Sequence, residues 1–327
     1  MVASRTKAAA ILATALIAGG CAMRMSREVV PPPGGTFARL NSGTNTRDLS
    51  EYMEKVRHLS TAMRPPTAQH LPTMEERDPE LAAELRLLAS APSADAQCRI
   101  AERYRQRGIL DAAYEHFSQA LALDSRSADA YEGLARVWRD WGLPHLGLAD
   151  AHRATYYAPQ SAAAQNTYGT LLQALGKYRE ARAAYELATW LDPRAAYAVN
   201  NLCYLSFLEG RTDAAIQGCT AALKLDPSLL AARNNLALAF AAAGKLDLTR
   251  KEFLDAGDRA SGLYNLGIVY LAAGDRPRAL AAFDEATRTR VTFALARERA
   301  NQIRGAMRTN PTLLTERLDG APGQQVP

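Results

Sequence analysis

Apolar residues in this chain recur in an arrangement that is repeated along most of its length. In the clearest copy, residues 196–227, an apolar segment with helical spacing ends at Leu208, and a second segment covers residues 213–225. Gly210 lies in the short turn between them, and Pro227 stops the second segment. The pattern therefore predicts a pair of helices joined by a tight turn in each copy.

Glycine residues mark the turn in every copy. Five of them are separated by 34 residues each, and a sixth follows after 30 residues. A fixed period in this range is typical of a repeat array, in which stacked neighbours supply the core that no single unit can form. Glycine suits a left-handed cap at a helix C-terminus, where a side chain would be strained. The turn glycines are Gly108, Gly142, Gly176, Gly210, Gly244 and Gly274.

Small and large side chains alternate between the two helices of a unit. Both helices of a unit carry large residues, for example Tyr168 and Tyr185, which alternate with small ones such as Gly169 and Ala181. This pairing lets antiparallel helices approach closely. Equivalent units are expected to begin at Ala94, Ala128, Ala162, Ala196, Leu230 and Ala260.

The repeat pattern over residues 94–289 resembles the tetratricopeptide repeat (TPR) family. The resemblance implies an all-α protein, a TPR α-solenoid of helix-turn-helix repeats in an open right-handed superhelix, and the equivalent starts above give six repeats. Local departures are Gly147 and Thr249, which replace a small alanine, and a fifth unit whose second helix looks shortened before Gly257.

The N-terminus has the pattern of a secretory signal peptide, assigned to residues 1–20. Basic residues precede an apolar run over residues 8–18, shorter than the roughly 20 residues that a bilayer-spanning helix needs. Small residues directly before Cys21 resemble the lipobox of bacterial lipoproteins, although Ala18 stands where leucine is most usual. The resemblance implies lipid attachment at Cys21; the alternative is an ordinary secreted protein with an accidental cysteine.

Residue 22 is Ala and not Asp, which under the enteric sorting rule implies the outer membrane, with the protein on its periplasmic face. Prolines and glycines after Cys21 predict a flexible tether. The second of two entry helices is expected to start at Asp78, with Pro79 in its first position. The predicted segments that flank the array are the lipidated N-terminus and tether (21–45), entry helices (46–92), a capping helix (290–308) and a disordered tail (309–327).

Composition narrows the possible functions. The chain is 48% hydrophobic with a net charge of +5, but it has no block of Lys and Arg of the kind that binds nucleic acid. Motifs for phosphate binding, zinc hydrolysis, redox cysteine pairs and the serine nucleophile elbow are not found. The five histidines are scattered. We therefore expect no catalytic site, metal or cofactor, and no nucleic-acid partner.

Two of the remaining cysteines, Cys203 and Cys219, lie on opposite sides of the turn at Gly210. Each is about two helical turns from that glycine, so an antiparallel pair of helices places them near each other. In an oxidising compartment they can form a disulfide. The alternative is that each is a small core residue, because helix axes about 8–10 Å apart often leave cysteines badly aimed. Cys98 is expected to stay a free, largely buried thiol.

Asparagines recur at matching positions of successive first helices, on or beside the face expected to line the concave groove. An amide both donates and accepts hydrogen bonds, so a row of them can grip the backbone of an extended peptide, whatever its side chains. A similar ladder lines the TPR superhelix of O-GlcNAc transferase. The alternative is that each asparagine bonds neighbouring backbone or water. The predicted peptide-binding residues are Asn166, Asn200, Asn201, Asn234, Asn235 and Asn265, with Tyr197, Tyr204 and Tyr264 as amphipathic contacts.

The carboxylate clamp of chaperone-tail-binding TPR domains needs Lys and Arg on the same face. Only Arg99 and Arg136 are candidates here, so the sequence does not support that specificity.

A lipobox, a tether and a TPR array together resemble the lipoproteins that assist pilus and secretion machines. Residues 231–287 are most similar to the TPR lipoprotein of Tad (Flp-type) pilus loci. The resemblance implies a membrane-anchored scaffold that binds a protein, or an extended segment of one, and helps an outer-membrane secretin assemble. The alternatives are a type IV pilus pilotin-like protein and a periplasmic adaptor in cell-wall or outer-membrane biogenesis.

Overall fold

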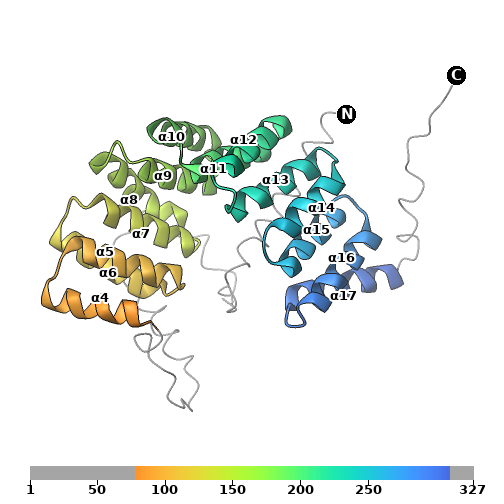
Figure 1. The fold of residues 1–327 in the computed structure, drawn as a ribbon, viewed down its shortest axis with the longest axis horizontal. Coiled ribbons are helices and arrows are strands. Elements are labelled where there is room, and N and C mark those ends of the chain that lie inside the picture. Colours follow the sequence, from red (N-terminus) through yellow and green to blue (C-terminus); the bar gives the residue numbers. More distant parts are fainter. Residues whose placement is uncertain (1–77, 310–327) are drawn as a thin grey trace, which may run out of the picture. The chain divides into compact units, whose positions relative to one another are not determined.

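The structure is a computed structural model of the 327-residue chain, and it describes residues 78–309. Every regular element in this range is a helix, from α4 to α17 (Figure 1). None of these helices is long and apolar enough to span a lipid bilayer. The predicted signal peptide, tether and first entry helix, and the tail beyond Thr309, lie outside the described residues.

The second predicted entry helix is α4 (Pro79–Ser90), and it begins where the sequence indicates. Pro79 fills the first helical position, where its missing N–H costs nothing. The Oδ1 atom of Asp78 accepts a hydrogen bond from the backbone N–H of Leu81 (3.1 Å) and caps the helix. Pro92 follows, before the first unit of the array begins at Ala94.

The array from Ala94 onward is a succession of helix pairs. Each first helix packs against its own second helix, and the second helix packs against the first helix of the following unit. The first helices are α5 (Ala94–Gln106), α7 (Ala128–Asp140), α9 (Ala162–Ala174), α11 (Ala196–Leu208), α13 (Leu230–Ala242) and α15 (Arg259–Ala272). The second helices are α6 (Leu110–Leu123), α8 (Pro144–Tyr157), α10 (Tyr178–Leu191), α12 (Thr212–Leu225), α14 (Leu246–Asp255) and α16 (Arg276–Thr289).

The helix starts confirm the predicted repeat. Five of the six first helices begin at the expected residue, and α15 begins one residue early, at Arg259. The capping helix is α17 (Ala294–Thr309), which packs on α16. These elements form an all-α solenoid, as the sequence predicted.

Large rings of second helices pack directly on glycines of first helices. A Cβ atom built on Gly169 would lie 2.6 Å from the ring of Tyr185, and one on Gly267 would lie 2.7 Å from the ring of Phe283. Both distances are far inside van der Waals contact, so only glycine fits beneath these rings. The predicted pairing of small and large residues is therefore confirmed, and it sets the close approach of the two helices in these units.

All six turn glycines adopt the left-handed backbone that the sequence predicted, with φ between +73° and +78°. Replacing Gly176 or Gly210 by valine is expected to lower the free energy of unfolding by about 1 kcal/mol or more, because a β-branched residue is strained at this angle. A Cβ on Gly176 would meet no atom within 4 Å, so the loss comes from the backbone alone. Thermal unfolding followed by circular dichroism measures it.

Gly305→Ala is the matched control for the turn glycines. Gly305 lies inside α17, has no positive φ, and a Cβ there would also meet nothing within 4 Å. Alanine should therefore leave stability unchanged or raise it slightly, by up to about 1 kcal/mol. Equal melting temperatures for Gly176→Val and wild type would contradict the left-handed assignment.

The fifth unit is shorter than the others, as its sequence indicated. Its second helix, α14, has 10 residues, whereas α12 before it and α16 after it have 14. Gly257 then turns the chain with φ +99°. The first helices on either side of α14 also differ in packing from an earlier pair: α13 and α15 make at most a marginal contact, whereas α11 and α13 lie side by side.

Candidate functional site

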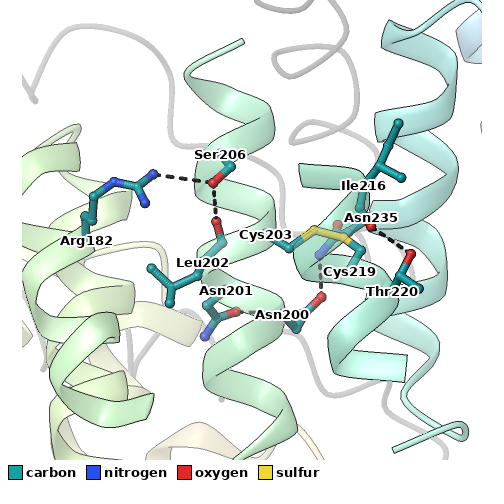
Figure 2. The surroundings of a disulfide bond; sticks show 10 residues. All are labelled: Arg182, Asn200, Asn201, Leu202, Cys203, Ser206, Ile216, Cys219, Thr220 and Asn235. Carbon is teal, nitrogen blue, oxygen red and sulfur yellow. Dashed lines mark hydrogen bonds between the residues drawn. A yellow bond between two sulfur atoms is a disulfide. The ribbon is translucent and has the colours of Figure 1, made fainter. Parts of the chain in front are cut away.

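A disulfide joins the two helices of the fourth unit. Cys203 in α11 and Cys219 in α12 are bonded through their sulfurs, with their Cα atoms 5.2 Å apart (Figure 2). Both side chains are buried. Of the two arrangements that the sequence left open, the structure has the bridge.

The disulfide lies at the position where the third unit has an aromatic ring packed on a glycine. Cys203 and Cys219 are 16 residues apart, the same separation as Gly169 and Tyr185 in the third unit. The fourth unit has no aromatic ring at this point, so a covalent bond closes its helix pair where packing closes the others. Cys98 is a free cysteine, and burial raises the pKa of its thiol to about 11.

Four asparagines of α9, α11 and α13 are hydrogen-bonded to one another. Nδ2 of Asn201 donates to Oδ1 of Asn166 (2.7 Å), and Nδ2 of Asn235 donates to Oδ1 of Asn200 (2.8 Å). Within α11, Nδ2 of Asn200 donates to Oδ1 of Asn201 (3.4 Å). Figure 2 shows Asn235 and Asn200 facing each other beside the disulfide. These four residues form a continuous chain across three units, called here the asparagine ladder.

The same connection exists one unit earlier with different residues. Oγ1 of Thr167 donates to Oε1 of Glu132 (2.9 Å), and both side chains are buried. The donor of this hydrogen bond lies 35 residues after its acceptor. The two hydrogen bonds of the asparagine ladder that join different units have the same separation. The amides of the ladder therefore join neighbouring units, a role that the sequence interpretation did not foresee. Asn200, which is 6% exposed, has its amide turned to its neighbours and not to an open groove.

Two of the six predicted asparagines stay outside the ladder. Oδ1 of Asn234 is buried and accepts no hydrogen bond from residues 78–309. Asn265 is half-buried, and its side chain makes no hydrogen bond within the described part of the chain. For these two amides the peptide-binding role stays a prediction.

The three predicted tyrosines differ in their surroundings. Tyr197 is 39% exposed at the start of α11, and Tyr204 is half-buried. Tyr264 is 5% exposed, because its ring packs on Phe283 and on Phe293 beside the capping helix. Tyr264 is thus a core residue and not an open contact, and this part of the predicted site is corrected.

A network of ion pairs covers the corresponding face of the first two units, and the sequence analysis missed it. Arg105 contacts Glu102 and Asp140, and Arg136 lies 3.4 Å from Glu102 and 3.6 Å from Glu132. Burial raises the pKa of Glu102, but hydrogen bonds from Arg105 and the charge of Arg136 outweigh it and hold the pKa below its usual value. Arg136, a candidate for a carboxylate clamp, already has two carboxylates of its own chain beside it.

Within residues 78–309, no group of three or more His, Cys, Asp or Glu side chains is arranged so that it could hold a metal ion.

Comparisons with known proteins agree with this architecture. The family described as tetratricopeptide repeat matches residues 162–194, which span α9, its turn and α10. A chain of the APC/C hetero-tetramer Cut9–Hcn1 superposes with a TM-score of 0.60 at 17% identity, over 69% of this chain. The fold is that of a TPR protein. The match covers 46% of that chain, so the present chain corresponds to about half of it.

Two bacterial pilus proteins share the TPR fold. PilF of Pseudomonas aeruginosa gives a TM-score of 0.50 at 21% identity, over 65% of this chain and 97% of PilF. PilW, a type IV pilus biogenesis factor, gives 0.55 at 20% identity, over 64% of this chain and 97% of PilW. At these identities the likeness concerns the TPR fold alone. No relative was found among curated protein sequences.

Proposed function

We propose that this chain is an outer-membrane lipoprotein whose TPR array binds a protein subunit of a Tad/Flp-type pilus or secretion machine and assists its assembly. The observation that carries the proposal is the array of six helix pairs, which begins beyond a lipobox cysteine at Cys21. Stacked repeats of this kind present extended surfaces that bind proteins. Lipid on Cys21 would hold that surface at the membrane where a secretin assembles.

The choice of a Tad/Flp machine rests on the sequence resemblance of residues 231–287. This segment forms α13 to α16, including the short α14 and the turn at Gly257. A type IV pilus pilotin-like role is the second candidate. It is favoured by PilF and PilW, because nearly the whole length of each superposes on this array. A periplasmic adaptor for cell-wall or outer-membrane biogenesis would use the same array with a different partner.

Cys21→Ala is expected to abolish incorporation of radiolabelled palmitate and to release the protein from the outer-membrane fraction, because the alanine side chain has no sulfur to acylate. If the lipidated array assists a secretin, the same variant should fail to restore secretin multimers in a strain that lacks the wild-type chain. Membrane fractionation and gel analysis of the multimers are the measurements.

Cys98→Ala is the matched control, since it removes a cysteine that is free and lies in the array. This variant should be labelled and localised like wild type. A wild-type protein found soluble and unlipidated in the periplasm would rule out the anchor. Normal secretin multimers in the deletion strain, together with co-purification of murein enzymes, would favour the periplasmic adaptor.

A further inference from the structure

Two consecutive second helices carry highly exposed aromatic rings. Trp190 in α10 is 74% exposed, and Tyr156, its equivalent one repeat earlier in α8, is 72% exposed. Within residues 78–309, no other large hydrophobic side chain is more exposed than these two. Tyrosine and tryptophan are the side chains that protein interfaces favour, because they bring a large contact area together with a polar group. The two rings therefore indicate a surface that a partner covers.

The ring of Tyr156 is held in place by its neighbours. It packs edge-on against Tyr157, whose own ring stacks on Tyr131. The guanidinium of Arg153 lies over the ring of Tyr131, 5.6 Å from its centroid. Because these contacts already restrain the ring, less conformational entropy is lost when a partner binds it.

Both helices present the same order of side-chain types on this exposed surface, called here the α8–α10 face. From its N-terminal end, each helix has a basic residue, an alanine, a long side chain and an aromatic ring. The intervals are four, four and three residues, which keep these side chains on one side of a helix. The residues, all exposed, are His145, Ala149, Arg153 and Tyr156 in α8, and Arg179, Ala183, Leu187 and Trp190 in α10.

This order is complementary to itself when it is reversed. Both helices pack on α9, and as equivalent members of consecutive units they run in the same direction. A two-fold axis that runs across them lays each helix antiparallel against the same helix of a second copy. Trp190 then lies over Arg179 of the second copy, and a guanidinium over an indole ring is a favourable contact. Leu187 lies beside Ala183 of the second copy, so a large side chain meets a small one and the helices can approach closely.

The charges on the α8–α10 face suit the same contact. Arg179 makes no ion pair within residues 78–309, so its guanidinium is available to the ring of Trp190 from a second copy. Arg153, which lies nearer the axis, is paired with Asp150 at 3.4 Å. The two copies of Arg153 therefore do not bring uncompensated like charges together.

The neighbouring second helices do not repeat this order. At the equivalent positions they have no aromatic ring and no large aliphatic side chain, so the self-complementary surface is confined to the second and third units. The equivalent residues are Asp111, Glu115, Gln119 and Ala122 in α6, and Asp213, Gln217, Ala221 and Lys224 in α12.

We propose that the α8–α10 face binds the same face of a second copy of this chain, which makes the protein a two-fold symmetric dimer. Every contact of such an interface occurs twice, so a modest set of side chains contributes double. The inference does not depend on the proposed function. The dimer contact uses second helices alone, and it therefore leaves the asparagine ladder of the first helices outside the interface.

Sedimentation-velocity ultracentrifugation of the mature chain measures the dimer, with Cys21→Ala present so that no lipid contributes to association. The chain should be dimeric at low micromolar concentration. Trp190→Ala should weaken the dimer about thirtyfold or more, as is typical of a central aromatic residue, and should leave the melting temperature unchanged because the ring is exposed. Leu248→Ala in α14 is the matched control. It removes a side chain that is 41% exposed outside the face, and the dissociation constant should stay within about threefold.

An exchange of Ala183 and Leu187 tests the two-fold arrangement itself. Ala183→Leu alone places two large side chains opposite each other, and Leu187→Ala alone places two small ones there. Each change should weaken the dimer about tenfold or more. The double variant again sets large against small, and its dissociation constant should return to within about threefold of wild type. A surface for a different protein or for a membrane would not be restored by this exchange.

A chain that stays monomeric at about 100 μM would overturn the proposal. A dimer that Trp190→Ala leaves unchanged would also overturn it, because association would then use another surface. If the chain is monomeric but floats with phosphatidylglycerol vesicles, and Trp190→Ala abolishes flotation, the α8–α10 face is a membrane contact and not a dimer interface.

Discussion

Reduction of the Cys203–Cys219 disulfide is expected to lower the free energy of unfolding of the TPR array by about 3 kcal/mol, the value typical of a bridge that closes a loop of about 15 residues. The bridge spans 16 residues and both sulfurs are buried. The loss should be as large as this because the fourth unit has no ring packed at the position of the bridge once the bond is broken. Urea unfolding with and without reductant, followed by circular dichroism, measures the difference.

Two double variants separate the covalent bond from the packing. Cys203→Ser with Cys219→Ser should be as unstable as the reduced protein and unaffected by reductant. Cys203→Gly with Cys219→Phe copies the pair Gly267 and Phe283 of the sixth unit, where the ring packs on the glycine. This variant should recover part of the stability and should also be insensitive to reductant. An identical urea midpoint for oxidised and reduced wild type would contradict a stabilising bridge.

Alkylation followed by mass spectrometry checks the bond itself. When the chain is unfolded without reductant, Cys98 should be modified while Cys203 and Cys219 stay unmodified. In the folded protein Cys98 should react slowly at neutral pH, because burial raises its pKa to about 11 and the thiol stays protonated. Modification of all three cysteines in unreduced, unfolded protein would mean that the bridge does not form.

The helices could be predicted closely from the sequence because several independent signals coincide at each boundary. In the third unit, for example, Gly176 requires a left-handed turn and Pro193 follows the last residue of α10 by two positions. The apolar spacing between these points has a helical period, and the same combination recurs after 34 residues. A helix boundary that is ambiguous in one repeat can therefore be placed from the equivalent boundaries of the other repeats.

The spacing of the repeats contains a further sequence signal for the disulfide. The distance of 16 residues from small residue to ring is visible at Gly169 and Tyr185, and Cys203 and Cys219 fall in the same two positions. Two positions that touch in the third and sixth units should also touch in this one. Reasoning from the repeat would have favoured the bridge over two separate thiols.

The role of the asparagines was harder to predict, because residue type and helix face do not reveal the partner of an amide. The partner depends on an offset of one residue between neighbouring helices, which places Asn235 against Asn200 and not against Asn201. Burial of Tyr264 likewise depends on Phe293, which precedes a capping helix that follows the last repeat. Both outcomes are properties of contacts between units, which a pattern within one unit does not contain.

Asn200→Ala is expected to destabilise the array by about 2 kcal/mol, because it breaks the ladder at its centre. Asn200 accepts a hydrogen bond from Asn235 and donates one to Asn201, and it is almost fully buried. Its removal leaves the Nδ2 of Asn235 and the Oδ1 of Asn201, both on half-buried residues, without these partners, in addition to the hydrogen bonds that are lost. Urea unfolding gives the free energy.

Asn265→Ala should change stability by less than about 0.5 kcal/mol, since it removes an amide that makes no hydrogen bond within the described chain. The two variants therefore separate an amide that holds two hydrogen bonds of the ladder, Asn200, from one that lies outside the ladder, Asn265. Because the ladder joins α11 to α13, its loss should also weaken the coupling between units, which in a repeat protein lowers the cooperativity of unfolding. The slope of the urea transition should then decrease in Asn200→Ala. Wild-type stability and slope in that variant would show that the ladder does not hold the units together.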